Sequence, residues 1–147
     1  MFFALAVSIG TLLVCLLCYG MVTAFVVHVV VRLIRKGYAG LGFWKNVSVM
    51  MIVSLITALM HLVEIALWAL AIRLCGAIST FEDAFYASAQ NYTSLGYGDL
   101  ILPGQWRILG PLEAINGLLL FGLSTAVMFA VMSRLIATRL HLRRGRT

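Results

Sequence analysis

Three long apolar runs, separated by shorter polar stretches, set the pattern of this sequence of 147 residues. The runs cover approximately residues 2–31, 46–72 and 108–133. A membrane hydrocarbon core about 30 Å thick requires about 20 apolar residues in a helix that crosses it. The pattern therefore predicts three transmembrane helices in an all-α membrane protein.

The connection between the second and third runs is too long for a tight hairpin and predicts a short helix. Thr80 is a suitable N-cap residue, and Glu82 and Asp83 fall in the first helical turn, where acids favour the positive end of the helix dipole. The helix predicted over 81–92 is too short to cross a bilayer. We therefore expect a re-entrant helix that enters the membrane and returns.

A polar loop with two glycines one residue apart follows this helix: Thr93-Ser94-Leu95-Gly96-Tyr97-Gly98-Asp99. Polar backbone at membrane depth is tolerated only where protein buries it or where it lines a water-filled path. Successive carbonyls can point at one axis only if the backbone alternates in handedness, which requires positive φ at some positions. Gly96 and Gly98 accept positive φ without steric cost. The loop therefore predicts a site for a dehydrated cation.

The side chains of this loop have separate expected places. Ser94 adds a hydroxyl at the inner end of the row of carbonyls, and Asp99 lies at the outer mouth. Leu95 and Tyr97 are expected to turn away from the axis and pack against the helix 81–92. The negative C-terminal end of that helix would point toward the middle of the membrane and favour a cation there.

Composition and charge support a membrane protein and indicate its orientation. The sequence is 63% hydrophobic and 11% charged, which excludes an ordinary soluble domain. If three helices cross the membrane, nine of the 11 Lys and Arg residues lie on the same side of it. Because basic residues concentrate in cytoplasmic loops, we expect the C-terminus in the cytoplasm and the N-terminus outside, in the plasma (inner) membrane. The net charge of +6 then reflects topology and contact with membrane lipid, with no nucleic-acid partner.

Two ionisable residues lie deep in the second run, His61 and Glu64, on one helix face. A charge at this depth costs several kcal/mol and marks a functional candidate. Two interpretations stay open: a proton- or cation-sensing gate, or a hydrogen bond to a neighbouring segment such as Gln90, Asn91 or Asn116. Because the spacing differs from the zinc-binding HExxH pattern, the sequence gives no support for a metalloprotease, and we expect no enzyme.

The third run carries two candidate gating residues, Gly117 and Gly122. Glycine in a transmembrane helix permits either bending or the close approach of another segment. The sequence favours neither a hinge nor close packing.

The heptad 93–99 resembles the TTVGYGD filter signature of potassium channels. Its position between two apolar runs and after a capped short helix is similar to that in the small bacterial ion channel pore-domain family. The resemblance covers 47–136, with an outer helix 47–72, pore helix 81–92, filter 93–99 and inner helix 108–136. Residues 1–46 would form an extra N-terminal transmembrane helix with a cytoplasmic linker, and 137–147 a basic cytoplasmic tail.

The resemblance implies a four-fold symmetric homotetramer that conducts K⁺ passively. Ser94, Leu95, Gly96 and Tyr97 would bind K⁺ through backbone carbonyls and the Ser94 hydroxyl. The remaining residues would support the filter, with Asp99 hydrogen-bonded to the pore helix: Thr93, Gly98, Asp99, Tyr86 and Gln90. The permeant ion is then the only cofactor or substrate, with no organic cofactor.

Two departures from the family pattern leave an alternative open. Ser94 stands where threonine is usual and Leu95 where valine or isoleucine is usual, which favours a weakly selective monovalent cation channel as the second hypothesis. A third hypothesis is a non-conducting membrane subunit that retains a pore-like fold.

Overall fold

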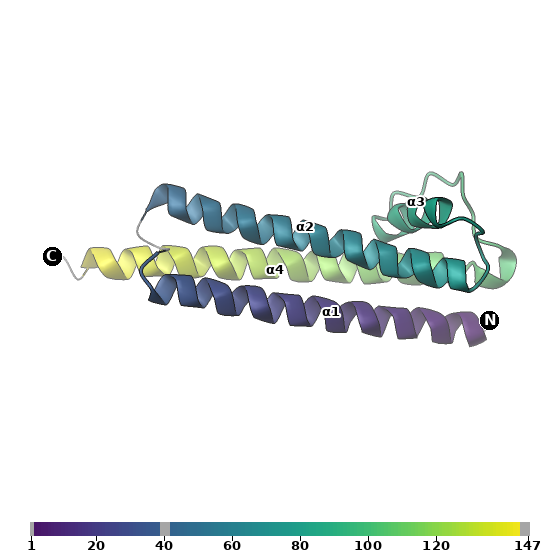
Figure 1. Cartoon of the computed structure of the whole chain (residues 1–147), viewed down its shortest axis with the longest axis horizontal. Coiled ribbons are helices and arrows are strands. Elements are labelled where there is room, and N and C mark those ends of the chain that lie inside the picture. The colour runs from purple at the N-terminus through teal and green to yellow at the C-terminus, as the bar shows by residue number, and fades with distance from the viewer. Residues whose placement is uncertain (1, 39–41, 145–147) are drawn as a thin grey trace. The chain divides into compact units, whose positions relative to one another are not determined.

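The computed structural model describes residues 2–38 and 42–144, with side chains up to residue 140. Those residues form helices without any strand, in the order α1 (Phe2–Arg35), α2 (Phe43–Leu74), α3 (Phe81–Tyr92), the 3₁₀ turn η1 (Gly104–Trp106) and α4 (Leu109–Arg144) (Figure 1). Three segments are long and apolar enough to cross a membrane: Phe2–Arg35, Phe43–Leu74 and Gly104–Leu140. The predicted all-α membrane fold with three transmembrane helices is confirmed.

The helix ends differ most from the prediction at the C-terminus. We predicted an inner helix over 108–136 and a tail over 137–147, whereas α4 continues to Arg144. The added residues are rich in Leu and Arg, which are good helix formers, and no Gly or Pro interrupts them before Gly145. The last three residues of the predicted tail, and residues 39–41 of the predicted linker, lie outside the described residues.

The structure divides into two compact units, each built from parts of all three long helices. Unit 1 comprises Met1–Tyr19 and Met60–Gly122, and unit 2 comprises Gly20–Leu59 and Leu123–Thr147. Unit 1 also contains the whole of α3 and the loop after it, which Figure 1 shows beside the Leu74 end of α2. The candidate site therefore lies within unit 1.

The core of unit 1 joins α1 to the other helices. Ala4 of α1 is buried in one cluster with Ala69 of α2 and Leu109 of α4. The rings of Phe3 and Trp106 meet edge to face, with centroids 5.8 Å apart. The first helix thus packs onto the C-terminal part of α2 and the N-terminal part of α4 within this unit.

The core of unit 2 is made of β-branched and leucine side chains, all buried: Val26, Val30, Val49, Val53, Val131 and Leu135. Each of the three helices contributes two of these residues, spaced by four positions and therefore on one helix face. This spacing explains why the three helix segments of unit 2 pack together along single stripes.

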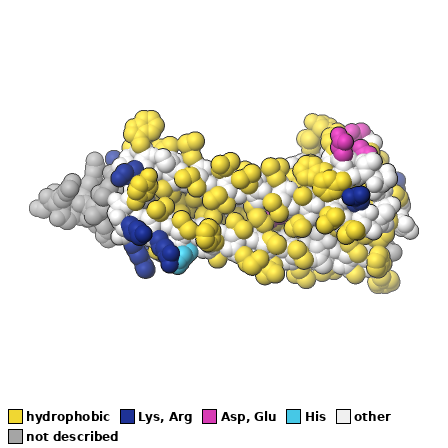
Figure 2. Space-filling view, viewed as in Figure 1, with side chains coloured by type: hydrophobic (Ala, Val, Ile, Leu, Met, Phe, Trp, Pro, Cys, Tyr) yellow, Lys and Arg dark blue, Asp and Glu magenta, His cyan; other side chains and the backbone are white. Residues whose placement is uncertain are grey.

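Apolar side chains also cover the outside of each unit (Figure 2). Many large ones are exposed, among them Leu17, Phe25 and Met51. Figure 2 shows Lys and Arg side chains gathered at one end of unit 2, and acidic side chains over α3 in unit 1. An apolar belt of this kind is stable when lipid covers it.

Candidate ion pathway

The start of α3 follows the sequence prediction. Its N-cap is Thr80, whose Oγ1 accepts a hydrogen bond from the backbone N–H of Asp83 at 3.1 Å. The helix runs over Phe81–Tyr92, the predicted 81–92, with Glu82 and Asp83 in its first turn. The cap and the two acids explain why a helix begins here, because both stabilise the N-terminal end of the helix.

The end of α3 is closed by the first residues of the polar loop. The N–H of Leu95 donates to the carbonyl of Gln90 at 2.9 Å, and the N–H of Ser94 donates to that of Asn91 at 2.9 Å. This pair of bonds is the Schellman motif, which requires a left-handed residue after the cap. Ser94 occupies that position with φ of 58°.

Two other helices of the chain end in the same motif with glycine at the left-handed position. Gly37 (φ 70°) closes α1, and Gly76 (φ 68°) closes α2. Among the described residues, Ser94 is the one non-glycine residue with positive φ. The sequence did not predict the positive φ of Ser94. Glycine adopts a left-handed conformation at lower cost, and a serine gives no indication of one.

Positive φ then recurs at every second residue of the loop. Gly96 has φ of 56° and Gly98 has φ of 81°. With Ser94, these residues give a backbone in which left-handed positions alternate with others. Successive carbonyls can point at one axis only if the backbone alternates in this way.

Asp99, at the end of the loop, is tied back to α3 by two hydrogen bonds. Its Oδ1 accepts from Nε2 of Gln90 at 2.8 Å, and its Oδ2 accepts from the hydroxyl of Tyr86 at 2.9 Å. These are the two partners that the resemblance implied. The bonds from Gln90, first, and from Tyr86 hold the pKa of Asp99 below its ordinary value. Donation to Asp99 raises the pKa of the Tyr86 hydroxyl.

Glu64 contacts the last residue of α3. The Tyr92 hydroxyl donates to Oε2 of Glu64, and Nδ1 of His61 lies 2.8 Å from the Tyr92 hydroxyl and 3.2 Å from Oε2 of Glu64. The partners considered from the sequence, Gln90, Asn91 and Asn116, were wrong. An aromatic hydroxyl 28 residues away meets the acid because α3 packs its C-terminal end against α2.

The glycines of α4 have different surroundings. A Cβ added to Gly117 would lie 2.0 Å from the backbone oxygen of Tyr92, whereas one added to Gly122 would have nothing within 4 Å. Close packing of α3 on α4 therefore accounts for glycine at position 117. A role for either glycine in gating stays a prediction.

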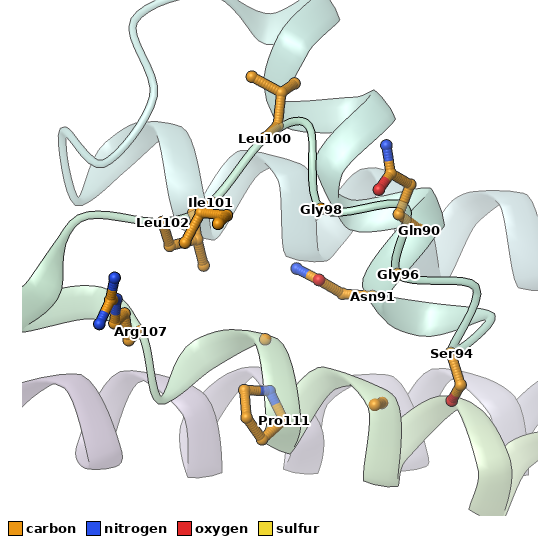
Figure 3. A pocket seen from close by; sticks show the side chains of 12 residues that line it. Gln90, Asn91, Ser94, Gly96, Gly98, Leu100, Ile101, Leu102, Arg107 and Pro111 are labelled. Atoms are coloured by element: carbon orange, nitrogen blue, oxygen red, sulfur yellow. The ribbon is translucent and has the colours of Figure 1, made fainter.

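A cavity of about 410 Å³ opens between the loop and α4. Figure 3 shows the Asn91 side chain extending into it from α3, with Arg107 and Pro111 on the opposite wall. Leu95 and Tyr97 are 55% and 70% exposed. Much of each side chain is thus uncovered in a single chain, and their packing against α3 stays a prediction.

Comparisons with known proteins agree with the resemblance carried by the heptad. Residues 60–134, about half of the chain, match the family described as "Ion channel". The chain belongs to this ion channel family. It is therefore a multi-pass membrane protein and a channel rather than an enzyme.

One curated relative has a more specific description than the family. The chain is similar to the "Inward rectifier potassium channel Kirbac3.1" of Paramagnetospirillum magnetotacticum, with 37% identity over 96 residues. The match covers 60% of this chain and 32% of the relative, so the chain spans about a third of the length of that protein. No solved structure matches the chain with significance.

Substitution of Gly117 by Ala tests the close packing of α3 on α4. The new methyl group would meet backbone, which cannot move aside as a flexible side chain can. We expect the substitution to destabilise the protein by about 1–3 kcal/mol. Thermal unfolding of the purified protein in detergent measures this, with Gly122→Ala as the matched control. Equal unfolding temperatures for the two variants would contradict the packing.

The carboxyl of Asp99 provides a pH test. Because its pKa is lowered in the folded protein, its stabilising bonds are fully present above the ordinary Asp pKa of about 3.9 and are lost as the pH falls through the lowered value. We expect Gln90→Leu to raise the Asp99 pKa more than Tyr86→Phe does. Carbon NMR titration of the Asp99 carboxyl measures both, and the reverse order would refute the ranking.

Proposed function

We propose that this channel conducts K⁺ selectively and passively through the loop 93–99. The observation that carries the proposal is the positive φ at alternate residues, Ser94, Gly96 and Gly98, within a Gly-Tyr-Gly-Asp sequence. A backbone of alternating handedness can direct successive carbonyl oxygens to one side. Carbonyl oxygens in such a row can replace the water shell of an alkali cation.

The ion-binding oxygens would come from four consecutive residues. The carbonyls of Ser94, Leu95, Gly96 and Tyr97 would form the row, and the Ser94 hydroxyl would complete its inner end. Thr93 and Gly98 flank the row, and Asp99 anchors its outer end to Tyr86 and Gln90. These bonds support the proposal because they fix the loop on both sides of the carbonyl row.

Four copies of the chain would surround the ion path. One loop supplies a single wall, whereas coordination of a dehydrated cation requires oxygens from several directions. The exposure of Leu95 and Tyr97 supports further copies, since these side chains would otherwise stay uncovered. A ring of four, as the resemblance implies, also fits the preference of homo-oligomers for closed symmetry.

The orientation in the membrane follows from charge. With the C-terminus in the cytoplasm and the N-terminus outside, most Lys and Arg residues would face inward, and Glu82, Asp83 and Asp99 would face outward. Asp99 would then lie at the outer mouth. The plasma (inner) membrane is the location that this orientation implies.

A weakly selective cation channel is the second candidate. Ser94 favours it, because it lacks the methyl group that restricts the hydroxyl rotamer of threonine. Planar bilayers with K⁺ opposite Na⁺ distinguish the two candidates. We expect a reversal potential displaced strongly toward the K⁺ equilibrium value. A reversal potential near zero would support the weakly selective channel.

Gly96→Ala tests the carbonyl row itself. Alanine at φ of 56° is strained, so we expect the row to distort and K⁺ flux into liposomes to fall at least about tenfold. Gly104→Ala is the matched control, because an added Cβ there meets nothing within 4 Å and φ is not left-handed. Equal flux in both variants would contradict the filter assignment. Absence of flux in the unmodified protein would instead favour a non-conducting subunit.

Glu64→Gln tests whether the buried acid controls opening. Glu64 holds Tyr92, the residue at which α3 ends and the loop begins, so a change in its protonation would act directly on the filter. If Glu64 and His61 form a proton-sensing gate, we expect Glu64→Gln to flatten the pH dependence of K⁺ flux. An unchanged pH dependence with lower tetramer recovery would assign Glu64 a structural role.

A further inference from the structure

A second buried acid, Glu113 of α4, contacts α3 at two points. Glu113 is fully buried, with 0% of its surface exposed, and so is Ser88. Oε1 of Glu113 lies within hydrogen-bond distance of the Ser88 hydroxyl, and Oε2 lies 3.3 Å from Nδ2 of Asn91. The same Ser88 hydroxyl lies 2.8 Å from the backbone oxygen of Ile65 in α2.

The number of available protons determines which residue donates in the contacts among Ser88, Glu113 and the carbonyl of Ile65. A serine hydroxyl has one proton to donate, and a backbone carbonyl can only accept. If Ser88 donates to Ile65, its contact with Glu113 requires a proton from Glu113. If Ser88 donates to Glu113 instead, two oxygens without a proton between them face each other at 2.8 Å. Both contacts are satisfied together only when Glu113 carries a proton.

The surroundings of Glu113 also favour the neutral acid. Among residues 2–38 and 42–140, whose side chains the structure describes, none forms an ion pair with it. Its partners on α3 are the neutral Ser88 and Asn91, and α1 contributes the thiol of Cys15. An unpaired carboxylate buried in such surroundings is strongly unfavourable.

Glu64 lies in different surroundings within the same unit. It accepts the Tyr92 hydroxyl, and its Oε2 lies 3.2 Å from Nδ1 of His61, a group that can carry positive charge. The contact between Oε2 of Glu64 and Tyr92 needs no proton on the acid, because the Tyr92 hydroxyl donates, whereas Oε1 has no hydrogen-bond partner among the described side chains. The two buried acids therefore hold α3 in opposite ways, one as an acceptor and one as a donor.

We propose that Glu113 is a carboxylic acid in the folded channel and positions the filter by donating to Ser88. Asn91 then donates to Glu113, Glu113 to Ser88, and Ser88 to the carbonyl of Ile65. This continuous chain of hydrogen bonds links α4, α3 and α2. The proposal concerns the support of the loop and rests on the proposed function only through the flux readout.

The consequence for the loop follows from the order of residues on α3. Ser88 and Asn91 lie on either side of Gln90, whose side chain holds Asp99 and whose carbonyl accepts the N–H of Leu95. Fixing Ser88 and Asn91 fixes Gln90 and thereby both ends of the loop. Glu113 thus acts on the ion path without contacting the ion.

Infrared spectroscopy of the full chain in lipid tests the protonation state directly. At neutral pH we expect a carbonyl-stretch band of a protonated carboxyl group that disappears in Glu113→Gln and stays in Glu64→Gln. A spectrum that Glu113→Gln leaves unchanged would overturn the proposal. Because this measurement does not involve ion flux, it stands even if the proposed K⁺ conduction fails.

Flux measurements with two variants test the positioning role. The glutamine amide can both donate to Ser88 and accept from Asn91, so we expect Glu113→Gln to keep K⁺ flux within about twofold. Leucine can do neither, and we expect Glu113→Leu to lose at least about tenfold, because it leaves buried polar groups unpaired. K⁺ flux is compared only for variants that elute as tetramers in size-exclusion chromatography. A large loss in Glu113→Gln, or none in Glu113→Leu, would refute the role.

Discussion

The short helix α3 must satisfy its polar side chains inside a chain that is otherwise built to face lipid. Ser88, Gln90 and Tyr92 of α3 are buried, and a buried polar group needs a hydrogen-bond partner within the protein. The neighbouring helices supply those partners: Glu64 and His61 from α2 meet Tyr92, and Glu113 from α4 meets Ser88. The position of α3, and with it that of the loop, depends on these buried contacts.

The backbone conformation at the start of the loop is set by the way in which α3 ends. The Schellman motif that closes α3 places Ser94 in the left-handed region, and Gly96 and Gly98 continue the alternation. The end of α3 and the start of the alternating φ values in the loop are therefore the same residue, Ser94. A substitution that changes how α3 ends would also change the geometry of the proposed ion path.

The sequence was sufficient for some features because their signals are local. The three spans follow from apolar runs, and α3 begins where Thr80 caps it. The buried contacts were not predictable in the same way, since Ser88 and Glu113 lie 25 residues apart and leave no periodic pattern. A charged residue inside an apolar run indicates that a partner exists but does not identify it.

The first helix covers an ionisable side chain of α2. Tyr19 of α1 stacks on His61, with ring centroids 6.2 Å apart, and both residues are buried. An ionisable group inside an apolar span is costly where it faces lipid. The stretch that matches the ion channel family begins at residue 60, so this partner of His61 comes from a helix outside the matched stretch.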